Sequence, residues 1–240
     1  MSTRPQRRRQ ARGGSPTNRP PQRDPMRMMY IGLAIAIALI VIAFGLLRFK
    51  QNRDYANALA TPSPGPNATQ KAIQLSDTGT SVGKPAMAPG DNKGGGAGGP
   101  VDGIKCEATE QVTMHIHSHL ALFVNGKQIE IPRFVGVAPT SNNSACLYWI
   151  HTHDASGVIH VESPELRQYV LGNFFDIWGE DLNRNQVGPY SGPVTAFING
   201  AKYDGDPAQI PLRAHQQITL EVGTPIVPPP NYSFPPSLSL

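Results

Sequence analysis

Two short histidine-rich stretches carry the clearest chemistry in this chain of 240 residues. They read Met114-His-Ile-His-Ser-His-Leu120 and Tyr148-Trp-Ile-His-Thr-His-Asp154, and Val158-Ile-His160 follows shortly after. Together they hold six of the seven histidines within 46 residues, namely His115, His117, His119, His151, His153 and His160. Neutral imidazole is the commonest protein ligand for zinc and copper. The two stretches therefore predict a metal site.

The spacing of these histidines is typical of β-strands. Within each stretch they recur at every second residue, and side chains at i, i+2 and i+4 of a strand point to the same face. We expect His115, His117 and His119 to form one row. His151 and His153 would form a second row, and those nearest the loops (His119 and His153) are candidates for a supporting role. Four ligands complete a tetrahedral ion, so six histidines leave either two spare side chains or a second ion.

Three carboxylates close to these rows are predicted to orient the imidazoles by accepting their N–H groups. They are Glu130, Asp154 and Glu162. A ligand set rich in imidazole suits Zn(II) and Cu(II) best, and the Irving–Williams order favours copper where it is available. The predicted cofactor is therefore a copper or zinc ion, and the sequence does not distinguish between them.

The first hairpin expected to position the histidines turns at Asn125-Gly126, the strongest short hairpin signal. Strands are predicted on either side of this turn, at residues 113–124 and 127–131. A two-residue turn sets Leu122 opposite Ile129, so the even-numbered face of the first strand is apolar. The other face carries three histidines and is free to bind.

A second hairpin is predicted from strands 147–153 and 158–162, joined by the loop 154–157. With this loop His151 lies opposite His160, and any loop of even length keeps the histidines of this hairpin on one face. The opposite face collects apolar side chains. Because both hairpins separate into an apolar face and a histidine face, we expect them to meet around one metal centre.

A helix is expected after the second hairpin. Ser163-Pro164-Glu165 is typical of a helix start, and apolar residues at helical spacing continue to Trp178, before Gly179. The alternative is a short strand at 169–171 followed by a helix at 172–178.

Later strands are predicted at residues 194–199, 202–203 and 217–222. The resulting order, two hairpins, a helix and further strands, predicts a small, mostly β domain of the α+β class. The expected topology is β-grasp-like, with a small β-sandwich as the alternative.

The two cysteines, Cys106 and Cys146, lie 40 residues apart and lack the C-x-x-C spacing of metal or redox motifs. In an oxidising compartment they predict one disulfide. Closing a loop of roughly 40 residues would stabilise the domain by about 3–4 kcal/mol. Two unpaired thiols, or thiolate ligands for a soft metal, remain as alternatives.

A membrane anchor is predicted near the N-terminus. Residues 29–47 contain no charge, and at 1.5 Å per residue they span about 28 Å, close to the roughly 30 Å hydrocarbon core. Eight arginines precede this segment and fewer basic residues follow it, which predicts a cytoplasmic N-terminus and an extracytoplasmic C-terminal domain. A cleaved signal peptide is the alternative.

The remaining composition divides the chain into five parts. A basic tail (1–28) precedes the transmembrane helix (29–47), and a linker rich in proline and glycine (48–100) leads to the histidine-rich domain (101–224) and a proline-rich tail (225–240). Residues 1–50 carry a net charge of +9, and residues 51–240 carry −5. Because nucleic-acid binding rests on basic surface, the acidic folded part is not expected to bind nucleic acid.

Four motifs in fixed order resemble a group of uncharacterised bacterial proteins that are secreted or anchored by one helix. The motifs are HIHSHL, FVNGK, CLYWIHTHDASGVIHVESP and LGNFFDIWG, and the resemblance covers roughly residues 106–222. It implies a location outside the cytoplasm and an intact domain at these residues. It implies no particular activity.

The function that the sequence favours is a membrane-tethered metal-binding module for sensing, buffering or delivering copper or zinc. A metalloenzyme with a three-histidine site and an open coordination position is the second hypothesis. An envelope interaction domain without metal is the third. No nucleophile motif, phosphate loop or nucleotide fingerprint is present. For the enzyme hypothesis Asp154 and Glu162 are candidate general bases, although each is equally suited to orienting a histidine, and neither a catalytic residue nor a protein partner is assigned.

Overall fold

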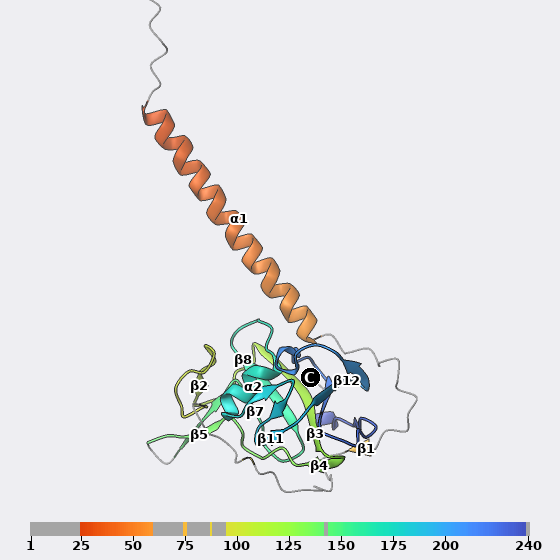
Figure 1. Cartoon of the computed structure of the whole chain (residues 1–240). Helices are drawn as coiled ribbons and strands as arrows, with labels where there is room; N and C mark the ends of the chain where they lie inside the picture. Colours follow the sequence, from red (N-terminus) through yellow and green to blue (C-terminus); the bar gives the residue numbers. More distant parts are fainter. Residues whose placement is uncertain (1–24, 60–73, 76–86, 88–94, 142–143, 239–240) are drawn as a thin grey trace, which may run out of the picture. The chain divides into compact units, whose positions relative to one another are not determined.

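The computed structural model describes residues 25–59, 74–75, 87, 95–141 and 144–238 (Figure 1). The chain divides into two compact units, Met1–Leu47 and Arg48–Leu240. Most of the predicted basic tail and much of the predicted linker lie outside the described residues.

The N-terminal helix α1 spans Pro25–Leu59 and contains the whole predicted apolar segment. Within it, Met28–Asp54 is long and apolar enough to cross a membrane. The helix continues past the predicted end at Leu47 because residues 48–59 contain good helix formers and neither glycine nor proline. Among the residues that the structure describes, one helix could therefore anchor the protein in a membrane.

The main sheet of the second unit has the strand order β13-β12-β14-β3-β8-β7, and β4 also pairs with β3 (Figure 1). Strand β14 runs parallel to β3, and the other pairs are antiparallel. The bounds are β3 Met114–Val124, β4 Lys127–Ile129, β7 Ile150–His151, β8 Val158–Ser163, β12 Val194–Ile198, β13 Ala201–Tyr203 and β14 Gln217–Val222. The domain is mostly β, as predicted.

One apolar core lies on the face of the sheet that carries the even-numbered residues of β3. It joins Ile116 of β3 and Ile159 of β8 to Phe174 and Trp178 of helix α2, which spans Leu171–Trp178. The main sheet is mixed, with the long strands β3 and β14 parallel at its centre, and the domain as a whole is of the predicted α+β, mostly β class.

Helix α2 begins later than the proline signal predicted. Ser163 is the last residue of β8, where it pairs with Met114, and its hydroxyl accepts from the Glu165 N–H. The helix instead begins after Val170, whose N–H donates to the Asn173 side chain. The alternative of a short extended segment before the helix is thus close to the structure, and Gly179 ends the helix with φ of 78°.

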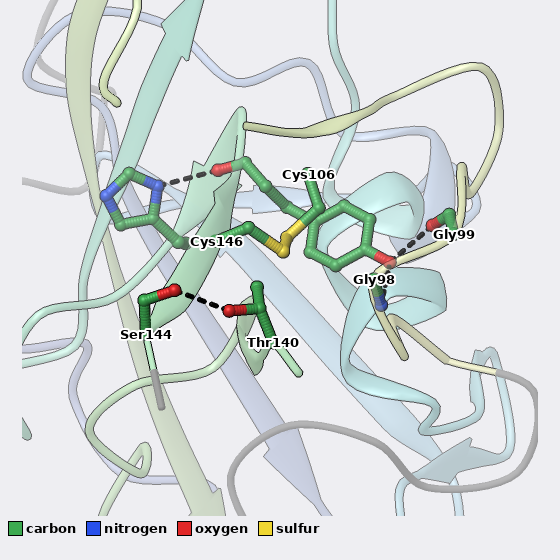
Figure 2. The surroundings of a disulfide bond; sticks show 8 residues. Gly98, Gly99, Cys106, Thr140, Ser144 and Cys146 are labelled. Carbon is green, nitrogen blue, oxygen red and sulfur yellow. Dashed lines mark hydrogen bonds between the residues drawn. A yellow bond between two sulfur atoms is a disulfide. The ribbon is translucent and has the colours of Figure 1, made fainter. Parts of the chain in front are cut away.

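The predicted strand 147–153 is divided between two sheets. Its first part belongs to β6 (Ala145–Tyr148), which pairs with β2 (Cys106–Glu107) and β5 (Val137–Pro139) in a small sheet. Its second part is β7 of the main sheet. The predicted disulfide between Cys106 and Cys146 is formed and joins β2 to β6 (Figure 2).

The described end of the predicted linker belongs to the folded domain. The Gly96 N–H donates to Ile177 O at 2.7 Å, and the Gly98 N–H donates to the Tyr148 hydroxyl at 2.9 Å. That hydroxyl in turn donates to Gly99 O (Figure 2). A Cβ atom at Gly96 would overlap the Tyr148 ring, so this glycine permits close approach rather than flexibility.

The remaining elements are short. A second three-stranded sheet contains β9 (Leu182–Asn183), β10 (Gln186–Val187) and β11 (Tyr190–Ser191), and β1 (Gln74–Leu75) pairs in parallel with β15 (Asn231–Tyr232). Two 3₁₀ helices are η1 (Pro207–Gln209) and η2 (Pro236–Leu238).

Candidate metal centre

Three neighbouring strands bring the two histidine rows together. Strand β8 lies between β3 and β7, so that His160 is opposite His117 on one side and opposite His151 on the other. Directly opposed residues on antiparallel strands share a face, with Cβ atoms about 4.5–5.5 Å apart. The predicted pairing of His151 with His160 is confirmed, and the rows meet across β8.

Glu162 lies among the histidine nitrogens. It is opposite His115 and only 3% exposed. Its Oε1 is 3.4 Å from His115 Nε2 and 3.2 Å from His160 Nδ1, and its Oε2 is 3.9 Å from His151 Nε2. Glu162 was expected only to orient imidazoles. The contact with His160 fits that role, but the contacts with both rows also make the carboxylate a candidate ligand.

The side chains fall into two overlapping groups that could each hold a metal ion. One group contains His115, His117, His160 and Glu162, and the other contains His151, His153, His160 and Glu162. Within each group the ligand atoms all lie within 4.8 Å of one another. His160 and Glu162 are common to both.

Backbone carbonyls fix the orientation of one imidazole in each row. The Nδ1 of His117 lies 3.1 Å from Leu238 O, and the Nδ1 of His151 lies 2.8 Å from Tyr148 O. In the tautomer in which Nδ1–H donates to the carbonyl, the Nε2 lone pair is free. For His117 this Nε2 is buried and has no hydrogen-bond partner among the described residues. The His117 ring therefore presents a free lone pair suited to a metal ion, whereas the His151 Nε2 contacts His153 Nε2 at 3.1 Å, within the second group.

Burial keeps the central imidazoles neutral. It lowers the pKa of His117 and of His151 to about 4, and the pKa of His160 to about 3. Burial is the largest cause of these shifts, the neighbouring histidines contribute in the same direction, and Glu162 opposes them at His117 and His151. At neutral pH these side chains can bind a metal ion without first losing a proton.

His119 lies outside both groups, so its predicted place among the metal ligands is not seen here. Its Nε2 lies 2.9 Å from Ser156 O, and its ring stacks on Tyr232 with centroids 4.0 Å apart. Burial lowers the pKa of His119 to about 4. His153, the other histidine next to a loop, belongs to the second group as its place in the predicted ligand row suggested, and its Nε2 is 3.1 Å from His151 Nε2.

Two of the three predicted carboxylates do not belong to either group. Asp154 closes the loop between β7 and β8, where its Oδ1 accepts from the N–H and the hydroxyl of Ser156 at 2.9 and 2.5 Å. Glu130 follows β4 and is half-buried. Alternation along a strand predicts the face of a residue, but it does not predict which loop carboxylates turn toward that face.

Glu110 was not among the predicted site residues, although it lies next to His153. Its Oε1 lies 3.5 Å from His153 Nε2, and both side chains are partly exposed, at 49% and 41%. Glu110 belongs to the irregular segment between β2 and β3, which has no periodic pattern. Only the tertiary structure brings this carboxylate to the edge of the second group.

The proline-rich C-terminal segment packs on the histidine face instead of extending freely. Leu238 O lies near the ring nitrogens of His117 and His215, at 3.1 and 2.9 Å. The Tyr232 N–H donates to the Gln217 side chain of β14 at 2.7 Å. The folded domain therefore continues beyond the predicted boundary at residue 224.

No protein-family model matches the chain, and no curated protein and no solved structure matches it either.

Proposed function

We propose that this protein is a membrane-tethered, extracytoplasmic module that binds copper or zinc on the histidine face of its β domain. The observation that carries the proposal is the buried Glu162 carboxylate. Its ion pairs among the described residues are all with histidines, and no lysine or arginine side chain takes part in them.

A buried carboxylate is costly unless a positive charge compensates it. The nearby His151 and His160 do not supply that charge at neutral pH, since burial lowers their pKa values to about 4 and about 3. A divalent cation among the imidazoles would compensate the carboxylate and use the free nitrogen lone pairs.

The donor set supports a late first-row transition ion. Imidazole suits zinc and copper, whereas calcium and magnesium prefer sites built from oxygen. The cysteines are joined in a disulfide and contribute no thiolate. The proposed cargo is therefore Cu(II) or Zn(II), for sensing, buffering or delivery.

The proposed location rests on the N-terminal half of the chain and on the disulfide. Helix α1 could anchor the protein, and disulfides persist in oxidising compartments outside the cytoplasm. The eight arginines before the helix favour a cytoplasmic N-terminus. The metal site would then face the extracytoplasmic side.

The test is metal analysis of the full-length protein, purified in detergent with an affinity tag that contains no histidine. We expect bound copper or zinc in the wild type and a loss of metal in His117→Ala. His119→Ala is the matched control, because His119 is a buried histidine of the same strand that lies outside both ligand groups. Equal metal content in the wild type and His117→Ala would contradict the proposal.

A further inference from the structure

We propose that the centre holds two metal ions side by side, joined by the carboxylate of Glu162. This inference rests on the proposed metal binding and specifies how many ions bind and which residue links them.

The two ligand groups each have a pair of histidines of their own. His115 and His117 belong to one group, and His151 and His153 belong to the other, with no member of one pair in the other group. His160 lies between the pairs, with its ring centroid 4.6 Å from that of His117 and 4.4 Å from that of His153. One ion on either side of His160 uses both pairs, whereas a single ion leaves one pair of inward-facing imidazoles unused.

The Glu162 carboxylate is oriented toward both ligand groups. Its Oε1 faces His115 of the first group, and its Oε2 faces His151 of the second. The Oε2 is buried and has no hydrogen-bond donor among the described residues. A carboxylate whose two oxygens face different ligand groups is arranged to bridge two ions, which in two-metal sites lie about 3.5–4 Å apart.

The number of ligands predicts that the two ions are not equivalent. Each ion has two histidines of its own and one oxygen of Glu162. A neutral His160 has a single lone pair and can complete only one of them. One ion is therefore closed with four protein ligands, and the other retains a position for water or another small ligand.

The negative charge available to a second ion lies near the surface. Glu110 approaches His153 to 3.5 Å at the partly exposed edge of the second group, and Asp154 interacts electrostatically with His160. Together with Glu162 these carboxylates offset much of the charge of two divalent ions. Solvent can reach the partly exposed edge of the second group and screen the positive charge that is left.

The test is a titration of the full-length, detergent-solubilised protein with Cu(II), followed by electron paramagnetic resonance. We expect two Cu(II) per chain and a spin-coupled spectrum with a half-field transition. The double variants His115→Ala/His117→Ala and His151→Ala/His153→Ala should each bind one ion and give the spectrum of isolated Cu(II). His119→Ala should still bind two coupled ions.

The outcomes separate this inference from the proposed function. One ion per wild-type chain would overturn the two-ion centre and leave the metal-binding module intact, whereas no bound ion would overturn both. Two ions without spin coupling, or coupling that is unchanged in Glu162→Gln, would refute the carboxylate bridge. The wild-type titration decides the number of ions even if a double variant fails to fold, which circular dichroism would show.

Discussion

At the level of single residues, Glu162 is a buried carboxylate surrounded by the histidines of the centre. The side chain is 3% exposed, and its ion pairs among the described residues are with His115, His151 and His160. Its effect on stability should therefore change sign with the metal. Without a metal the buried charge is a cost, and with a metal it is a ligand.

Glu162→Gln should consequently have opposite effects on the two forms. In the presence of a chelator we expect its free energy of unfolding to rise by about 1–2 kcal/mol, since a poorly compensated buried charge is removed. Metal affinity should fall by roughly 10–100-fold or more. Urea unfolding with and without Zn(II) measures both effects, and a variant destabilised equally under both conditions would contradict this role.

The neutral histidines also predict how the metal-free domain responds to acid. Folding lowers the pKa of His117, His119 and His151 to about 4 and that of His160 to about 3, from 6.5. At pH values between about 4 and 6.5, the unfolded chain therefore binds more protons at these histidines than the folded chain does. Stability is therefore fully present above about pH 6.5 and is lost as the pH falls toward 4.

Urea midpoints measured with a chelator at several pH values test this response. We expect the midpoint to decrease steadily from pH 7 to pH 5. A midpoint that stays constant over this interval would show that the four imidazoles are not held neutral by the fold.

At the level of secondary-structure elements, the C-terminal segment completes the site. The carbonyl of Leu238 in η2 accepts from His117 Nδ1 and so leaves Nε2 free for the metal. Ending the chain at Phe234 removes this carbonyl and should weaken metal binding by roughly 10–100-fold, as for other groups that orient ligands. Leu238→Ala retains the carbonyl and is the matched control.

Calorimetric titration with Zn(II) distinguishes these two variants. Unchanged affinity in the shortened chain would mean that another group fixes the tautomer of His117. Equal losses in both variants would indicate that the leucine side chain, and not the carbonyl, supports the site.

The same elements show what the sequence could predict. The Asn125-Gly126 turn fixed the register of β3 and β4, and Leu122 pairs with Ile129 as expected. Alternation correctly placed the histidine rows on one face. The division between β6 and β7 was not predictable, because both parts share one apolar pattern and the disulfide partner in β2 takes only the first part.

Ligand assignment within the site depended on tertiary contacts. His119 and His153 are both adjacent to loops, yet His119 faces Ser156 and Tyr232, whereas His153 faces His151. Nothing in their spacing distinguishes them. The position of the C-terminal segment could not be predicted either, because a proline-rich sequence does not indicate the surface on which it packs.

At the level of the whole molecule, the proposed orientation places the domain outside the cytoplasm. An amine reagent that cannot cross membranes should label the exposed Lys127 and Lys202 in intact cells. A lysine introduced before the helix by Gln22→Lys should react only after lysis. Peptide mass spectrometry reads both positions, and the reverse pattern would invert the topology.

The central claim is that the histidine face of β3, β8 and β7 binds metal. Anomalous diffraction at the metal absorption edge, from crystals of protein loaded with Zn(II), tests it most directly. We predict a peak among His115, His117, His151, His153, His160 and Glu162, about 2.0–2.1 Å from the coordinating nitrogens. A peak located elsewhere, for example at His215, or no peak in the loaded protein would contradict the account.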